Sequence, residues 1–404
     1  MIHQVKISAD TIDYLRQIID LQFLLLHLAV RESVVTPENV RDTLNPTYGS
    51  KIDDVTKWIT GKKKTLVEPL NQFAAHPNAS NKKAFVDQLD VDIQLLFTHG
   101  AGVIQVDFNF SDDWKIAAGN FLKQFYELFN DGFPAYLFHN SLPYSRQNFI
   151  SSFIQENDGL YLCAICDTVA YRASTEHHTY TSIDHFFPKA RYPHLSIHPY
   201  NLVPICTLCN SWFKGDQNPL AQLGDIAELI LPYGHQPGLS QQTFLQFRLR
   251  ADLLNRDKHP LELLFKPTNS FRSETFILSF ENIYKIQARW NEDLDQLDQH
   301  VFRRITQFLL GDVQNGYSCA DATWLADRLR ILMGLVYIED LGRDPFGFAT
   351  TWLLYYHIEC LRYSALDKPV PIHKALIDWA DKQQDHIERI RRTATSLSSR
   401  VPTQ

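Results

Sequence analysis

Apolar residues recur at intervals of three and four along most of the first 145 residues. This spacing places them on one face of an α-helix. Runs of turn-forming residues separate the apolar segments from one another. The pattern predicts a helical N-terminal region, residues 1–145, with helices over Thr11–Val30, Pro37–Ile59, Asn81–Thr98 and Asp112–Asn130.

The C-terminal region, residues 223–404, begins with short strand-like segments and continues as helices. Strands are expected over Thr243–Leu249 and Glu274–Phe280. A nearly unbroken apolar series then predicts one long, core-packed helix over Ile283–Leu309. The polar residues Thr393–Gln404 are expected to form a disordered tail. Further helices are expected over Cys319–Ile338, Pro345–Tyr363 and Pro371–Thr393.

The middle region, residues 146–222, is rich in His and Cys and lacks long apolar periods. A helix over Ser145–Gln155 is followed by two short strand patterns. The first, Ser182–Phe187, ends before Pro188, and the second is Asn201–Ile205. A short helix is expected to begin at Ser211–Lys214. The sequence thus predicts a mainly α protein with a small central ββα module and a few extra strands after it.

The bulk properties restrict the class of protein. A chain of 404 residues is too long for one ordinary core, and 45% hydrophobic with 21% charged residues is typical of a soluble globular protein. The longest apolar run, Leu21–Val30, is too short to cross a bilayer, and the first residues resemble no secretion signal. We therefore expect a cytoplasmic protein without a membrane partner. The net charge of −7 argues against tight, indiscriminate binding to DNA.

Four of the six cysteines form two C-x-x-C pairs, Cys163 with Cys166 and Cys206 with Cys209. In a cytoplasmic chain this pattern indicates zinc rather than disulfides. Four thiolates complete a closed tetrahedral site, so the predicted zinc, one per chain, is structural and pins the ends of the segment together.

Two other interpretations of the cysteines remain open. The pairs could be redox-active or core cysteines, or His177 or His178 could replace one cysteine at the metal. The isolated cysteines Cys319 and Cys360 are expected to be buried core thiols.

Polar residues between the cysteine pairs suggest a second site. A hairpin folded against the short helix would bring Asp184 and Asn210 to one place, where their oxygens suit Mg²⁺ or Mn²⁺. His185 follows Asp184 and would lie near this ion, and a neutral imidazole can deprotonate a water near neutral pH. Taken singly, Asp184, Asn201 and Asn210 are also common turn and cap residues.

The segment from Cys163 to Asp216 resembles the HNH endonuclease family in its zinc-knuckle form, whose fold is called ββα-metal. The resemblance implies that Asp184 and Asn210 bind the catalytic ion and that His185 is the general base. It also implies that Asn201 organises the long loop by hydrogen bonding. Lys214 matches a basic residue of the final helix that contacts phosphate. The flanking regions match no domain, and the segment looks most like stand-alone bacterial HNH proteins.

The function expected from this resemblance is metal-dependent hydrolysis of phosphodiester bonds. Double-stranded DNA is the favoured substrate, and RNA is not excluded. Lys189 and Arg191 lie beside the base, where they could hold phosphates, although solvated loop charges are an equal alternative. The acidic regions suggest that activity is gated by a partner, a ligand or self-assembly through the helical flanks, as in an anti-phage defence effector.

Two rival functions belong to other classes. One is an inactive, zinc-stabilised module that binds nucleic acid or protein. The other is a zinc hydrolase that acts through the cysteine site, which the lack of an open ligand position disfavours.

Overall fold

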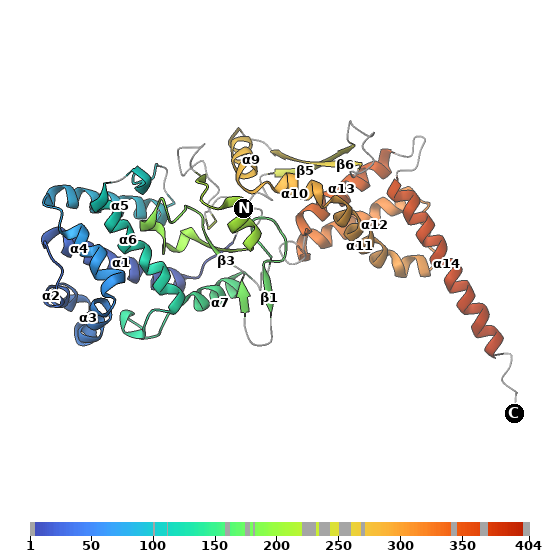
Figure 1. The fold of residues 1–404 in the computed structure, drawn as a ribbon. Helices are drawn as coiled ribbons and strands as arrows, with labels where there is room; N and C mark the ends of the chain where they lie inside the picture. Colours follow the sequence, from blue (N-terminus) through green and yellow to red (C-terminus); the bar gives the residue numbers. More distant parts are fainter. Residues whose placement is uncertain are drawn as a thin grey trace, which may run out of the picture. The chain divides into compact units, whose positions relative to one another are not determined.

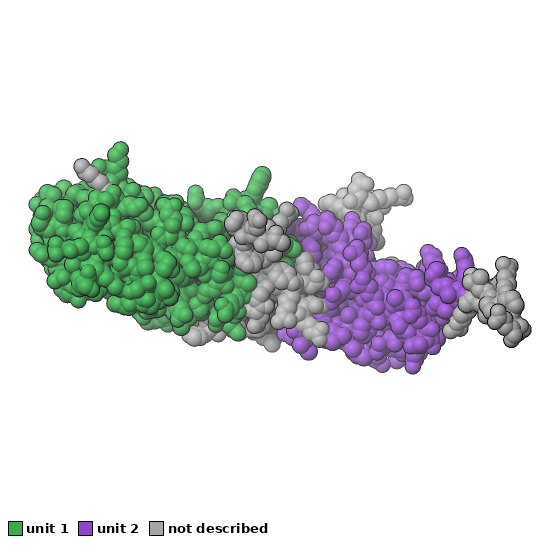
Figure 2. All heavy atoms as spheres, turned by 90° about the horizontal axis from the view of Figure 1, so that it is seen from below, with its two compact units in different colours: residues 1–242, 269–285 green, residues 243–268, 286–404 purple. Residues whose placement is uncertain are grey.

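The structure is a computed structural model, and its described part is mostly helical, with small two-stranded antiparallel sheets (Figure 1). This confirms the mainly α class. The chain divides into two compact units, residues 1–242 with 269–285 and residues 243–268 with 286–404 (Figure 2). The structure describes residues 5–99, 102–110, 112–157, 162–173, 178–180, 182–219, 232–233, 243–249, 260–267, 271–340, 346–363 and 371–398.

The N-terminal helices of the first unit pack around an aliphatic and aromatic core. Polar caps set their starts: the side chains of Ser8, Thr36 and Asn78 each accept a hydrogen bond from a first-turn amide. The central helix α1 packs against α2, α4 and α5, and α4 packs against α6. The helices are α1 (Ala9–Arg31), α2 (Pro37–Tyr48), α3 (Ile52–Gly61), α4 (Glu68–Ala74), α5 (Ala79–Phe97), α6 (Asp113–Asp131) and α7 (Arg146–Glu156).

The single helix expected over Pro37–Ile59 is two helices. Gly49 has a φ of 49°, in the left-handed region that favours glycine, and it ends α2. Helix α3 starts three residues later, at Ile52. Helix α4 lies in a stretch for which no helix was expected.

The central segment of the first unit contains two hairpins and a helical turn. Strand β3 (Ser182–His185) pairs antiparallel with β4 (Leu202–Ile205), with Asp184 opposite Val203. Both strands lie within the predicted segments. A seven-residue helix with π-type hydrogen bonds, η7 (Leu208–Lys214), follows β4. The other hairpin pairs β1 (Tyr171–Ala173) with β2 (His178–Tyr180).

The strand expected over Glu274–Phe280 is wrong, because this stretch belongs to helix α9 (Phe271–Tyr284). Its buried residues Ile277, Phe280 and Tyr284 are spaced by three and four, which is the period of a helix rather than of a strand. Helix α9 belongs to the first unit and contacts η7.

The second unit pairs β5 (Thr243–Leu249) with β6 (Leu261–Pro267), and helices follow. The long helix expected over Ile283–Leu309 is interrupted, because Lys285 adopts a φ of 52° between α9 and α10. The apolar stripe is nevertheless buried in both later helices, at Ile286 and Leu297 among others. The helices of this unit are α10 (Ile286–Glu292), α11 (Leu294–Gln314), α12 (Ala322–Leu335), α13 (Gly347–Tyr363) and α14 (Pro371–Ser398).

Two further expectations concern the limits of these regions. Helix α14 runs to Ser398, so the disordered tail expected from Thr393 is helical as far as that residue. Residues 399–404 and the boundary expected at residue 222 lie outside the described residues. Among the described helices, none is long and apolar enough to cross a membrane.

Candidate functional site

The four paired cysteines meet in one buried cluster. The Sγ atoms of Cys163, Cys166, Cys206 and Cys209 all lie within 4.8 Å of one another, and none is in a disulfide. A ZnS₄ tetrahedron with bonds of about 2.3 Å separates its sulfurs by about 3.8 Å. The Cys166 and Cys206 Sγ atoms are 3.7 Å apart. The cluster can therefore hold a metal ion such as zinc.

The backbone around the cysteines favours such a cluster. The first pair sits in a tight turn in which the Cys163 amide donates to the Thr168 carbonyl at 2.8 Å. The second pair joins the end of β4 to η7. Burial raises the pKa of Cys163 and of Cys209, whereas hydrogen bonds from the neighbouring thiols lower the pKa of Cys166 and of Cys206. Four buried thiolates this close together need a cation beside them. The alternative ligand His177 lies outside the described residues, as does the side chain of His178.

Asp184 is buried and paired with a lysine. The Lys214 Nζ donates to the Asp184 Oδ1 at 2.9 Å and to the His185 carbonyl at 2.6 Å. Lys214 is only 1% exposed. Burial raises the pKa of Asp184, and the lysine ammonium counteracts this effect. A phosphate contact by Lys214 therefore requires its side chain to leave this pair.

Asn210 reaches the same face of the hairpin as Asp184. Its Nδ2 donates to the Ser182 hydroxyl, and Ser182 and Asp184 are two residues apart on β3, so their side chains share a face. The Asn210 and Asp184 oxygens suit a hard divalent ion completed by water. The chemistry of these two donors therefore suits such an ion, which would have to displace Lys214 from Asp184.

His185 is held with its ring in a defined orientation. Its Nε2 lies 3.0 Å from the Ser196 carbonyl oxygen, which fixes the hydrogen on Nε2. Nδ1 then carries the lone pair, and it makes no hydrogen bond to any described residue. Burial lowers the pKa of His185 to about 3, and Lys189 and Lys214 add to this effect. The imidazole is therefore neutral across the physiological pH range.

Asn201 ties together the loop between β3 and β4. Its Oδ1 accepts from the Phe187 amide at 2.6 Å, and its Nδ2 donates to the Phe187 and Leu195 carbonyls at 3.1 and 2.8 Å. The side chain is fully buried. Asn201 thus ties Phe187, at the start of the loop, to Leu195, the residue before Ser196.

The two basic residues beside His185 are engaged with carboxylates of the N-terminal helical region. The Lys189 Nζ lies 2.9 Å from the Glu127 Oε1, and the Arg191 Nε lies 3.0 Å from the Asp107 Oδ2. The Asp107 carboxylate also raises the pKa of Arg191. Both cations remain part-exposed, so they can exchange these partners for phosphate.

Two tyrosines near the candidate site cannot be identified from the sequence. Tyr126 of α6 contacts the His185 ring, with 4.3 Å between ring centroids. Tyr284 of α9 is fully buried, and burial together with Asp184 and Cys209 raises its pKa. Each tyrosine is far in the chain from the residues it is near, so only the fold reveals these neighbours.

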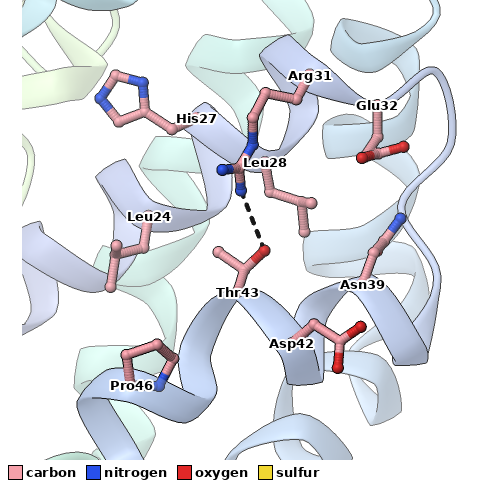
Figure 3. Close-up of a pocket in the computed structure, with 9 residues that line it drawn as sticks. All are labelled: Leu24, His27, Leu28, Arg31, Glu32, Asn39, Asp42, Thr43 and Pro46. Carbon is pink, nitrogen blue, oxygen red and sulfur yellow. Dashed lines mark hydrogen bonds between the residues drawn. The ribbon is translucent and has the colours of Figure 1, made fainter.

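An open pocket of about 500 Å³ lies between α1 and α2, away from these residues (Figure 3). The Arg31 Nη2 donates to the Thr43 hydroxyl across it at 3.2 Å. None of the candidate site residues lines this pocket. Its lining residues are Leu24, His27, Leu28, Arg31, Glu32, Asn39, Asp42, Thr43 and Pro46.

Comparisons with known proteins give a short local similarity. No protein-family profile matches the sequence, and no solved structure matches it. Protein ea31 of Escherichia phage lambda is 40% identical over 52 residues, which are 13% of this chain and 17% of that protein. The match spans less than a fifth of either chain, so it shows a shared segment and not a shared family.

Proposed function

We propose that the protein is a metal-dependent HNH-type nuclease that hydrolyses phosphodiester bonds, with DNA as the favoured substrate. The observation that carries the proposal is the state of His185. It is neutral, its Nε2 hydrogen is directed to the Ser196 carbonyl, and its Nδ1 lone pair is left to act as a base. It follows Asp184 directly on β3, within a hairpin-and-helix arrangement that a four-cysteine cluster ties together.

Each residue has a defined task in the proposed reaction. His185 Nδ1 takes a proton from the attacking water, and the hydroxide adds to phosphorus while the bond from phosphorus to the leaving 3′-oxygen breaks. The leaving oxygen takes a proton from solvent. Asp184 and Asn210 would hold one Mg²⁺ or Mn²⁺, which supplies charge stabilisation at the phosphate and the leaving oxygen. Asn201 keeps the loop carrying the Ser196 carbonyl in place, and so fixes the His185 tautomer. Lys189 and Arg191 supply positive charge for the phosphates of the bound strand.

The proposal is tested with His185→Gln, because glutamine can still donate to the Ser196 carbonyl but cannot act as a base. Wild-type protein should cleave plasmid DNA with Mg²⁺ or Mn²⁺, and the variant should be slower by about 100- to 10,000-fold. His27→Gln, at an exposed position of α1, serves as the matched control and should retain full activity. Equal cleavage by wild type and His185→Gln eliminates the mechanism.

The second candidate is a zinc-stabilised module that binds nucleic acid or protein without cleaving it. The buried Asp184–Lys214 pair favours this reading, because a carboxylate that already has a cation can be purely structural. Binding of DNA without cleavage, in the presence of either Mg²⁺ or Mn²⁺, would support this alternative.

A further inference from the structure

The loop between β3 and β4 rests on one face of α6. At Gly119 an added Cβ would lie 2.6 Å from Phe108 and 3.0 Å from Pro193, so only glycine permits this close approach. One turn later, the Ser196 hydroxyl donates to the Leu122 carbonyl at 3.4 Å. Tyr126 follows four residues after Leu122, on the same side of the helix.

Both contacts that orient the His185 ring are anchored on this face. The Ser196 carbonyl accepts from Nε2, and Ser196 itself is tied to α6 through its hydroxyl. The Tyr126 ring meets the imidazole at an interplanar angle of 66°, in a T-shaped contact. Tyr126 is buried, and the Lys189 ammonium lies 4.6 Å from its ring centroid.

One hydrogen bond fixes the tautomer of a histidine, but it leaves the ring able to rock about the bond. A second contact against the ring removes that freedom. A general base acts only when its lone pair points at the water, and a misplacement of about 1 Å can cost about 100-fold in rate. The Tyr126 ring is in position to supply the second contact.

We propose that α6 is the orienting element of the candidate active site and that Tyr126 is a positioning residue for His185. This inference rests on the proposed nuclease function, in which His185 is the base. It makes the N-terminal helical region part of the catalytic unit rather than an accessory domain. The region provides Tyr126 against the imidazole, Leu122 under the loop and Glu127 against Lys189.

The test compares Tyr126→Leu with Tyr126→Phe, using Phe121→Leu as the matched control. Phe121 is also buried on α6, but its ring packs on Phe125. Tyr126→Leu should lower kcat by about 100-fold and leave KM unchanged. Tyr126→Phe keeps the ring and should retain kcat, as should Phe121→Leu. Tyr126→Met serves in place of leucine if that variant does not fold.

A readout independent of cleavage is the ¹⁵N NMR spectrum of histidine-labelled protein, with the His185 signals identified by His185→Gln. Wild type and the α6 variants should all keep the Nε2–H tautomer that the Ser196 carbonyl fixes. The ¹⁵N relaxation of the His185 ring nitrogens should show a rigid ring in wild type, Tyr126→Phe and Phe121→Leu, and a mobile ring in Tyr126→Leu or Tyr126→Met. The proposal is overturned if the leucine variant keeps the wild-type ring rigidity and kcat, or if Phe121→Leu loses as much kcat. If wild type does not cleave DNA but the rigidity of the His185 ring still depends on Tyr126, the nuclease function is disproved and the positioning role is retained.

Discussion

A buried carboxylate requires a counter-charge, and Asp184 has one in Lys214. Both side chains are almost fully buried, so the pair is little screened by solvent. The same carboxylate is the proposed ligand of the divalent ion. Lys214 and the ion are therefore alternative counter-charges for one acid, and the free energy of ion binding includes the displacement of the ammonium.

Replacing Lys214 should separate the contribution of the lysine ammonium to stability from that of the divalent ion. Lys214→Met leaves Asp184 buried without a partner, and we expect a loss of about 3–5 kcal/mol in the free energy of unfolding. Added Mn²⁺ should restore much of this loss, because the ion takes the place of the ammonium. Thermal unfolding with and without Mn²⁺ measures both effects.

The control for this experiment is the double variant Asp184→Asn with Lys214→Met. It has neither charge, so Mn²⁺ should leave its melting temperature unchanged. A Mn²⁺ shift in wild type as large as in Lys214→Met would show that the ion does not compete with the lysine.

A second buried group predicts how stability depends on pH. Burial lowers the pKa of His198 to about 3 from its ordinary 6.5. Between these values the unfolded chain binds the proton and the folded chain does not, so stability rises with pH. The contribution is complete above about pH 6.5 and is lost towards pH 3, by up to about 1.4 kcal/mol per pH unit.

His198→Asn should flatten this dependence. Asparagine cannot titrate, and its Oδ1 can accept from the Tyr200 amide as the His198 Nδ1 does at 3.2 Å. Urea unfolding of both proteins between pH 4 and 7 gives the difference in slope, with exposed His27→Asn as a control. Parallel slopes for wild type and His198→Asn would show that this pH dependence does not come from His198.

At the scale of elements, local signals located what lies close in sequence. The C-x-x-C spacing identified the cysteine cluster, and the alternation ending at Pro188 identified β3. No local signal connects Tyr126 with His185, because that contact depends on how α6 packs against the hairpin. The burial of Lys214 was equally hidden, since a lysine near a helix end is ordinarily solvated. Short apolar runs such as that of α9 suit a strand or a helix, and packing decides between them.

The cysteine cluster joins the turn at Cys163 to the corner between β4 and η7. Protein purified without chelator should contain about one zinc per chain. Cys206→Ser should lose the zinc and lower the melting temperature of the first unit. Elemental analysis and calorimetry measure the two effects.

Cys319→Ser, which replaces an equally buried thiol of the second unit, is the matched control and should keep the zinc. An unchanged melting temperature after zinc removal would contradict the structural role.

At the scale of the whole molecule, charge would determine how the proposed nuclease binds nucleic acid. The chain carries a net charge of −7, and the described partners of Lys189 and Arg191 are the acids Glu127 and Asp107. Phosphate must compete with these carboxylates for both cations. Long-range attraction of the polyanion is weak as well, which is consistent with a nuclease that acts only after a partner or ligand delivers its substrate.

His185→Gln protein, which the proposed mechanism makes inactive, should therefore bind DNA weakly, with a Kd of about 10⁻⁴–10⁻⁶ M at physiological salt and a shallow salt dependence. Glu127→Gln and Asp107→Asn, made in that background, release one cation each. Each should strengthen binding and steepen the slope of log K against log salt by about one.

Asp53→Asn makes the same change of charge at an exposed acid of α3 that pairs with Arg41, and it should leave the slope unaltered. Fluorescence anisotropy across a salt series gives all four slopes. Tight binding by the His185→Gln protein with a steep slope would rule out gating by these carboxylates, because many phosphate contacts would already be available.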